Sequence, residues 1–188
     1  PRHLVPGGWR NCRPDALLRL VGRETVELYA PRNKPFLSTR EVFTLKAKGN
    51  EQLLAAWRDG NESEKRALLA DMAERPAPDL SSFNLEPTAL DVEWHFTVGE
   101  LVNLIAYVHE LPFMSVNPGL ASASDWQHVA FKGGSEPGVL NLTTLLVSAP
   151  RTTYVVSATW NDDEQALDET RFMTLYTGLL SALAQLGG

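Results

Sequence analysis

The residues best suited to chemistry are a lysine, two glycines and a serine at consecutive positions: Lys132, Gly133, Gly134 and Ser135. A lysine ammonium can hold an anionic ligand, and glycines let that ligand lie against the backbone. Strand-like stretches flank the segment at 126–132 and 139–148, with Gly and Pro between them as in a hairpin. Two interpretations follow: an anion-binding strand edge, or a solvated lysine in a glycine-rich hairpin.

His128 is a further candidate for the same groove. It alternates with Lys132 along the first expected strand, so both side chains should lie on one face. Trp126 is close enough in the sequence to line a pocket there, although packing explains a tryptophan equally well.

Metal and cation sites are weaker alternatives. Glu93 and His95 would share one face of a strand, whereas His109 falls on an expected helix. No third close ligand for a metal is evident beside Glu93 and His95. The acids at 162–164 could hold a cation, yet their place at an expected helix start favours capping. The sequence therefore predicts no metal and no cofactor.

Composition excludes several classes of protein. The chain has 188 residues, with 44% hydrophobic and 21% charged residues, as expected for one globular domain. The net charge of −6 leaves no basic excess to neutralise nucleic acid, and no apolar run is long enough to span a bilayer. Cys12 is the sole cysteine, so no disulfide forms within the chain, and no orienting partner supports it as a nucleophile.

Helix and strand signals are separated along the chain. Capping boxes or similar start signals at 38–41, 61–64 and 97–100 predict helices, and a further helix is expected at about 15–27. Three strands are expected at 126–132, 139–148 and 153–160, followed by a final helix capped by residues 161–164. Helices first, then an antiparallel meander, then a closing helix packed on the sheet indicate an α+β fold.

Several segments, in order, resemble one family. Lys-Gly-Gly-Ser at 132–135, followed by two strands and an amphipathic helix, resembles the end of the class A β-lactamase and penicillin-recognising serine hydrolase family, whose Lys-[Ser/Thr]-Gly triad lies on the edge strand beside its active site. The segments 35–41 (PFLSTRE) and 131–139 (FKGGSEPGV) are similar to β-lactamase-like serine hydrolases. Residues 15–24 resemble the helix after the family's Ser-Asp-Asn motif. The resemblance covers residue 15 to the C-terminus.

The resemblance implies a chemistry in which a serine attacks an amide or β-lactam carbonyl and forms an acyl-enzyme. Lys132 would pair with the substrate carboxylate and take part in the proton network. Gly133 stands where the family usually has Ser or Thr, and Gly134 would permit close backbone approach. The backbone N–H of Ser135 would be an oxyanion donor.

The chain also departs from the family. It contains no Ser-x-x-Lys, and of the Ser-Asp-Asn motif only Asn11 fits, because Trp9 stands in the serine's place. We therefore expect an irregular arm at 1–14 and, at 15–188, a partial domain with an incomplete β-lactamase/transpeptidase-like fold. A truncated reading frame is one hypothesis, which the upstream nucleotide sequence would test.

The functional expectation is a β-lactamase-like serine hydrolase, acting on a β-lactam or a related amide or ester and inactive as this chain stands. The alternative is a non-catalytic domain that binds a carboxylate-bearing ligand or a partner chain. A third possibility is an unrelated α+β domain, which a centrally buried Lys132 strand would favour. The resemblance implies a small anionic substrate and a periplasmic or extracellular location, although the chain shows no signal peptide. The family's N-terminal strands, which complete its sheet, are missing from the resemblance. Without them, an edge of the sheet would be open to self-association.

Overall fold

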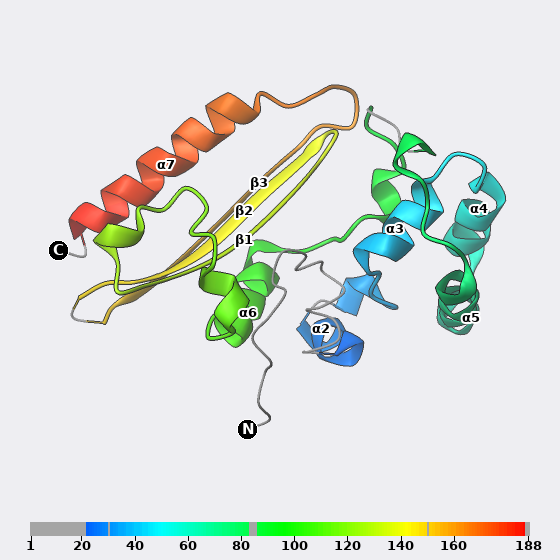
Figure 1. Cartoon of the computed structure of the whole chain (residues 1–188), viewed down its shortest axis with the longest axis horizontal. Helices are drawn as coiled ribbons and strands as arrows, with labels where there is room; N and C mark the ends of the chain where they lie inside the picture. Colours follow the sequence, from blue (N-terminus) through cyan, green and yellow to red (C-terminus); the bar gives the residue numbers. More distant parts are fainter. Residues whose placement is uncertain (1–21, 30, 83–85, 150, 187–188) are drawn as a thin grey trace.

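A computed structural model describes residues 22–29, 31–82, 86–149 and 151–186 (Figure 1). In these residues, helices come first, a three-stranded antiparallel sheet follows and a long helix closes the chain, which confirms the α+β fold. The expected arm at 1–14, with Asn11 and Cys12, lies outside the described residues. The α-helices are α2 (Arg23–Tyr29), α3 (Thr39–Lys46), α4 (Glu51–Asp59), α5 (Glu62–Glu74), α6 (Val98–Val108) and α7 (Glu169–Leu186). Short 3₁₀ turns are η2 (Pro31–Asn33), η3 (Leu80–Ser82), η4 (Leu90–Val92), η5 (Pro112–Ser115) and η6 (Ala123–Asp125).

Local side-chain chemistry sets the start of three helices. Ser38, Asn61 and Thr97 each accept a hydrogen bond from the backbone three residues on, and the glutamate there bonds back to the cap. The three expected start signals are therefore confirmed as capping boxes. Each satisfies backbone N–H groups that the first helical turn leaves without partners.

The sheet is a meander of β1 (His128–Glu136), β2 (Val139–Val147) and β3 (Thr153–Asn161), in the order β1-β2-β3. β2 is central and buried along most of its length, as its apolar run predicts. β1 is longer than expected, because it continues past Lys132 to Glu136 and pairs with β2 throughout. Only Pro137 and Gly138 form the turn.

Helix α7 covers one face of this sheet (Figure 1). Tyr176 and Leu180 of α7 are buried against the β2 side chains Leu140, Leu142 and Leu146. The phenol of Tyr176 donates to the carbonyl of Val156 at 3.0 Å, and burial raises the pKa of this phenol to about 12, so it stays neutral. The expected cap at 161–164 is wrong: the carboxylate of Asp162 accepts from the N–H groups of a turn, and the helix begins at Glu169.

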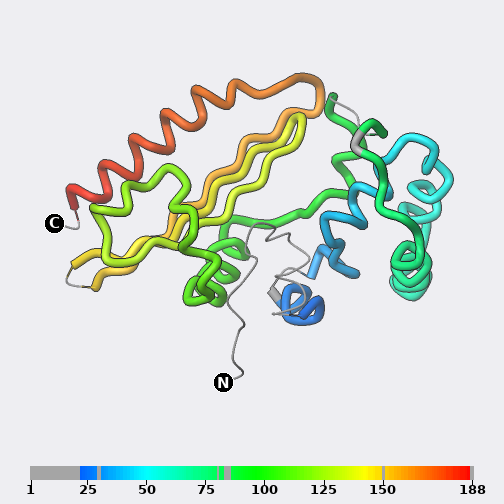
Figure 2. The backbone as a smooth tube through the Cα atoms, viewed as in Figure 1, coloured from blue at the N-terminus to red at the C-terminus, as the bar shows by residue number. Residues whose placement is uncertain are grey.

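Helix α6 covers part of the opposite face. Ile105 and Val108 pack with Ala130 of β1 and Leu145 of β2 at the end of the sheet away from the Pro137 turn. Helices α3, α4 and α5 surround a separate core that includes Val42, Trp57 and Met72. The extended segment 93–97 runs from this helical core to α6 (Figure 2).

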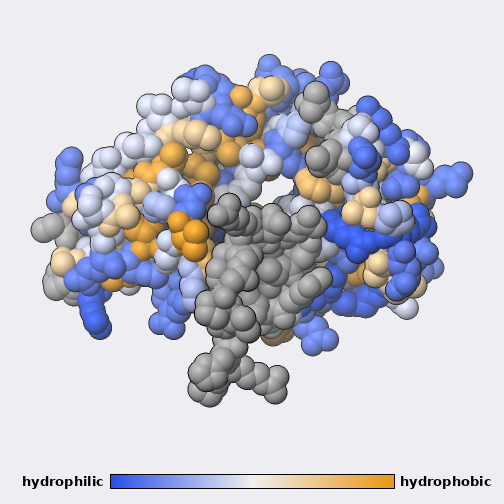
Figure 3. Space-filling view, viewed as in Figure 1, coloured by the Kyte–Doolittle hydropathy of each residue, from blue (hydrophilic) through white to orange (hydrophobic). Residues whose placement is uncertain are grey.

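The hydropathy of the visible surface differs between the sheet with α7 and the helices α4 and α5 (Figure 3). Apolar side chains gather between α7 and the sheet, whereas α4 and α5 present mainly hydrophilic atoms. Across the described helices, none is long and apolar enough to cross a membrane.

Candidate functional site

Lys132 lies on an edge strand. β1 pairs only with β2 among the described residues, and Lys132 is opposite Thr143 near the middle of the strand rather than at its end. The residue is exposed, its ammonium donates to the carbonyl of Gly133, and no carboxylate in the described chain forms a salt bridge with it. Lys132 is thus a cation on an accessible edge.

The surroundings of the Lys132 ammonium are crowded although the residue reaches solvent. Desolvation by nearby protein atoms lowers the pKa of Lys132. Since the residue as a whole is exposed, we take the ammonium to be protonated at neutral pH. A bound anion would offset the desolvation and favour the charged form.

The two glycines after Lys132 differ in the space that surrounds them. A Cβ on Gly133 would come within 2.9 Å of the Phe131 ring, so a Ser or Thr at this position would require the ring to move. A Cβ on Gly134 would meet nothing within 4 Å, so the sheet face beside it is open. Ser135 is exposed one residue further on, towards the turn.

A polar row crosses the sheet on the face that carries Lys132 and Gly134. Register places Lys132 beside Thr143, and Thr143 beside Ser157 of β3. The hydroxyls of Thr143 and Ser157 are 2.9 Å apart, and the amide of Asn141 donates to the hydroxyl of Thr159 at 2.7 Å. Sequence reasoning missed this row, although alternation in β2 and β3 could have indicated it.

His128 lies at the start of β1, on the same face as Lys132 but four residues away, which is about 13 Å along a strand. Its Nε2 is 3.2 Å from the carbonyl of His109, and the two imidazole rings meet edge to face with centroids 5.8 Å apart. The ring is therefore engaged at the end of α6, and its role in the groove stays a prediction.

A second charged group lies at the turn end of β1. The ammonium of Lys46, the last residue of α3, bonds to the carboxylates of both Glu93 and Glu136. Only 10%, 10% and 17% of the Lys46, Glu93 and Glu136 side chains is exposed, so this is a buried ion cluster rather than a surface pair. We call these three residues the Lys46 cluster.

The electrostatics of the Lys46 cluster are uneven, because two carboxylates share one ammonium. Burial raises the pKa of Glu93 to about 7, the hydrogen bond with Glu136 adds to the rise, and Lys46 opposes it. Burial alone would lower the pKa of Lys46, but the hydrogen bonds and charges of the two glutamates outweigh it and raise this pKa. Near neutral pH, the cluster therefore gains or loses a proton.

The residues considered for a metal are not brought together. Glu93 belongs to the Lys46 cluster, His109 contacts His128, and the His95 ring bonds to the carbonyl of Asp91. Within the described ranges, no three His, Cys, Asp or Glu residues form a group that could hold a metal ion.

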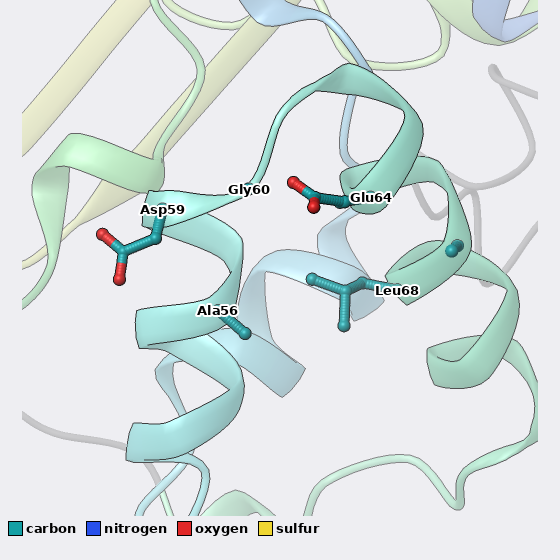
Figure 4. Close-up of a pocket in the computed structure, with 6 residues that line it drawn as sticks. Ala56, Asp59, Gly60, Glu64 and Leu68 are labelled. Atoms are coloured by element: carbon teal, nitrogen blue, oxygen red, sulfur yellow. The ribbon is translucent and has the colours of Figure 1, made fainter.

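Two hollows are lined by described residues other than Lys132. One of ≈ 500 Å³ lies between α4 and α5 and is lined by Ala56 and Leu68; Glu64 points toward Gly60, whereas the carboxylate of Asp59 points away from α5 (Figure 4). Glu64 is already used in its capping box. The other, of ≈ 320 Å³, lies beside the Pro137 turn and is lined partly by Ser135 and Leu167. The second hollow touches the candidate edge, whereas the first lies among the helices.

No family model matches the chain, and no curated protein matches it significantly. The resemblance to β-lactamase-like serine hydrolases stays a prediction, based on the motifs at 15–24, 35–41 and 131–139.

Proposed function

We propose that the β1 edge at Lys132 binds the carboxylate of a small anionic ligand, as part of a β-lactamase-like serine hydrolase domain. The observation that carries the proposal is an exposed lysine on an edge strand, with Gly134 two residues on, where an added Cβ would meet nothing within 4 Å. An edge strand offers backbone N–H and C=O groups that are not used in the sheet, and the ammonium adds a charge-assisted hydrogen bond.

Binding and hydrolysis are separate parts of this proposal. The chain contains no Ser-x-x-Lys, so it lacks the family's activated nucleophile. We expect the chain to bind a β-lactam reversibly without becoming acylated. A non-catalytic domain that binds a carboxylate-bearing ligand is the second candidate, and the same exposed lysine supports it.

Replacing Lys132 by Ala should weaken the binding of benzylpenicillin about tenfold or more, since one charge-assisted hydrogen bond contributes about 1.5–3 kcal/mol. The dissociation constant can be measured by calorimetry at low salt. Lys48→Ala is a matched control, because Lys48 is also exposed but lies between α3 and α4 rather than on β1. Equal affinity of the wild-type chain and Lys132→Ala would remove this role from Lys132.

The ligand supplies a second control. The methyl ester of benzylpenicillin lacks the negative charge, so Lys132→Ala should leave its weaker binding nearly unchanged. Intact-mass spectrometry after incubation with benzylpenicillin separates the two candidate functions. A covalent adduct would contradict the expectation that this chain does not form an acyl-enzyme.

A further inference from the structure

The Lys46 cluster joins three elements that are distant in the sequence. Lys46 ends α3, Glu93 follows η4, and Glu136 is the last residue of β1. Each side chain comes from an element end, where the backbone is less constrained than inside a helix or strand. The cluster is thus a polar link between the helical core and the hairpin.

A second contact holds the same end of the hairpin. Gly138 is buried in the turn, and Pro87 lies so close that a Cβ on Gly138 would be 3.0 Å from its ring. The carbonyl of Gly138 accepts from the N–H of Asp162 at 2.8 Å. The turn is therefore packed on both sides, and Glu136 is the charged side chain that anchors it to α3.

The position of Glu136 connects this link to the candidate edge. Glu136 directly follows Ser135 and shares a strand face with Gly134 and Lys132. Glu136 and Ser135 form the last two pairs of β1 with β2, opposite Val139 and Leu140, so the side-chain contact of Glu136 with Lys46 lies beside these pairs. The cluster thus ties the last residue of the candidate edge to the end of α3.

Charge balance gives the link two states. With both carboxylates ionised, the buried cluster carries one net negative charge, and two like charges lie beside each other. With one proton on the carboxylate pair, the cluster is neutral and the carboxyl group can donate a hydrogen bond to its neighbour. The neutral state is the one that burial favours.

We propose that the Lys46 cluster is a proton-operated clamp that holds the turn end of β1, and hence the Lys132 edge, against α3. Uptake of one proton from solvent tightens the clamp, and its release frees a carboxylate to turn outward. The effect on ligand binding rests on the proposed function, but the clamp itself does not.

The other charged groups nearby are engaged elsewhere. Asp91 of η4 pairs with Arg58 at 2.6 Å, and 53% of its side chain is exposed. Lys132 lies four residues back along β1 and bonds to the Gly133 carbonyl. The carboxylates of Glu93 and Glu136 therefore face Lys46 and each other, and no further charged group contributes to the pKa of Glu93.

The sign of the pH effect follows from the direction of the shift. The pKa of Glu93 is higher in the folded chain, about 7, than its ordinary value of 4.5. Its stabilising contribution is therefore complete below about pH 4.5 and is lost as the pH rises through about 7. We expect the clamp to be closed in mildly acidic solution and to loosen in mildly alkaline solution.

Amide hydrogen exchange without ligand tests the clamp. The N–H of Asp162, which bonds to the turn, should lose about tenfold in protection factor between about pH 6 and pH 8, while amides in central β2 should not change. Glu93→Gln, which mimics the protonated group, should keep high protection at both pH values. Asp91→Asn, two residues away on η4, should retain the wild-type response.

A wild-type protection factor that does not change with pH would overturn the clamp, and so would a response that persists in Glu93→Gln. Carbon-13 NMR of the Glu93 carboxyl group adds a readout independent of stability, and a midpoint near the ordinary value would also overturn it. If the pH response is present but benzylpenicillin does not bind, the proposed function fails and the clamp remains.

Discussion

Gly138→Ala should destabilise the chain by about 2–4 kcal/mol. The backbone of Gly138 has φ +80°, which residues with a side chain rarely adopt. The added Cβ would also lie 2.2 Å from the carbonyl oxygen of Asp162 and 3.0 Å from the Pro87 ring. Thermal or denaturant unfolding measures the loss.

Alanine variants at two other glycines distinguish the two causes of this loss, which are backbone strain and the close contacts of the added Cβ. Gly49 has φ +90° but open space around its would-be Cβ, so Gly49→Ala should show the backbone strain alone, about 1–2 kcal/mol. Gly134 has neither feature, and Gly134→Ala should change stability by less than about 0.5 kcal/mol. A Gly138→Ala variant no less stable than Gly49→Ala would contradict the close packing of the turn.

Helix starts were predictable from sequence because their causes are local. A capping box needs only two side chains three residues apart, and all three expected ones formed. The sequence predicts the start of the last helix at 161–164, several residues before the observed start at Glu169, for a related reason. The carboxylate of Asp162 does accept from backbone N–H groups, but these belong to Glu164 and Gln165 in a turn. The helix begins only after Asp168, whose carboxylate accepts from the N–H of Arg171.

The length of β1 was underestimated because consecutive glycines suggest a break in a strand. In the fold, Gly133 is required by a ring that lies over it, and pairing with β2 keeps both glycines extended. Whether a strand continues through glycine thus depends on pairing with a neighbouring strand. The strand propensity of the local sequence contains no information about that pairing.

The Lys46 cluster could not be predicted from the sequence. Its members are 47 and 90 residues from Lys46, and nothing in the local pattern of α3 indicates that its last lysine turns inward. In the sequence, Glu93 stands out only with His95 and His109, as a possible metal ligand. The one available signal was Glu136, a charge on the same strand face as Lys132, two positions beyond Gly134.

The outer edge of β3 is an unprotected surface. β3 contains no charged residue and no proline, the usual devices that prevent edge pairing, and among the described residues it pairs only with β2. Leu175, Leu179 and Leu186 of α7 are 67%, 47% and 77% exposed. Their spacing places them along one stripe of the helix, about 100° from the buried Tyr176 and Leu180 stripe.

We propose that a second copy of the chain covers this surface. Antiparallel pairing of two β3 edges keeps Tyr154 and Trp160 on the same face in both copies, so the two α7 helices come to lie on one side of a continuous sheet. The leucine stripes of the two helices could then pack together. Self-complementarity of both the strand edge and the stripe favours a second copy over an unrelated partner.

The double variant Leu175→Glu/Leu179→Glu should make the chain monomeric across about a hundredfold range of concentration in which we expect the wild type to form dimers. Sedimentation velocity measures the change. Leu28→Glu/Val116→Glu is the matched control, because these residues are 79% and 73% exposed and lie outside the proposed interface. It should dimerise like the wild type. A wild-type chain that stays monomeric at high concentration would contradict the interface, and dissociation by the control would show that added negative charge, rather than the α7 stripe, separates the copies.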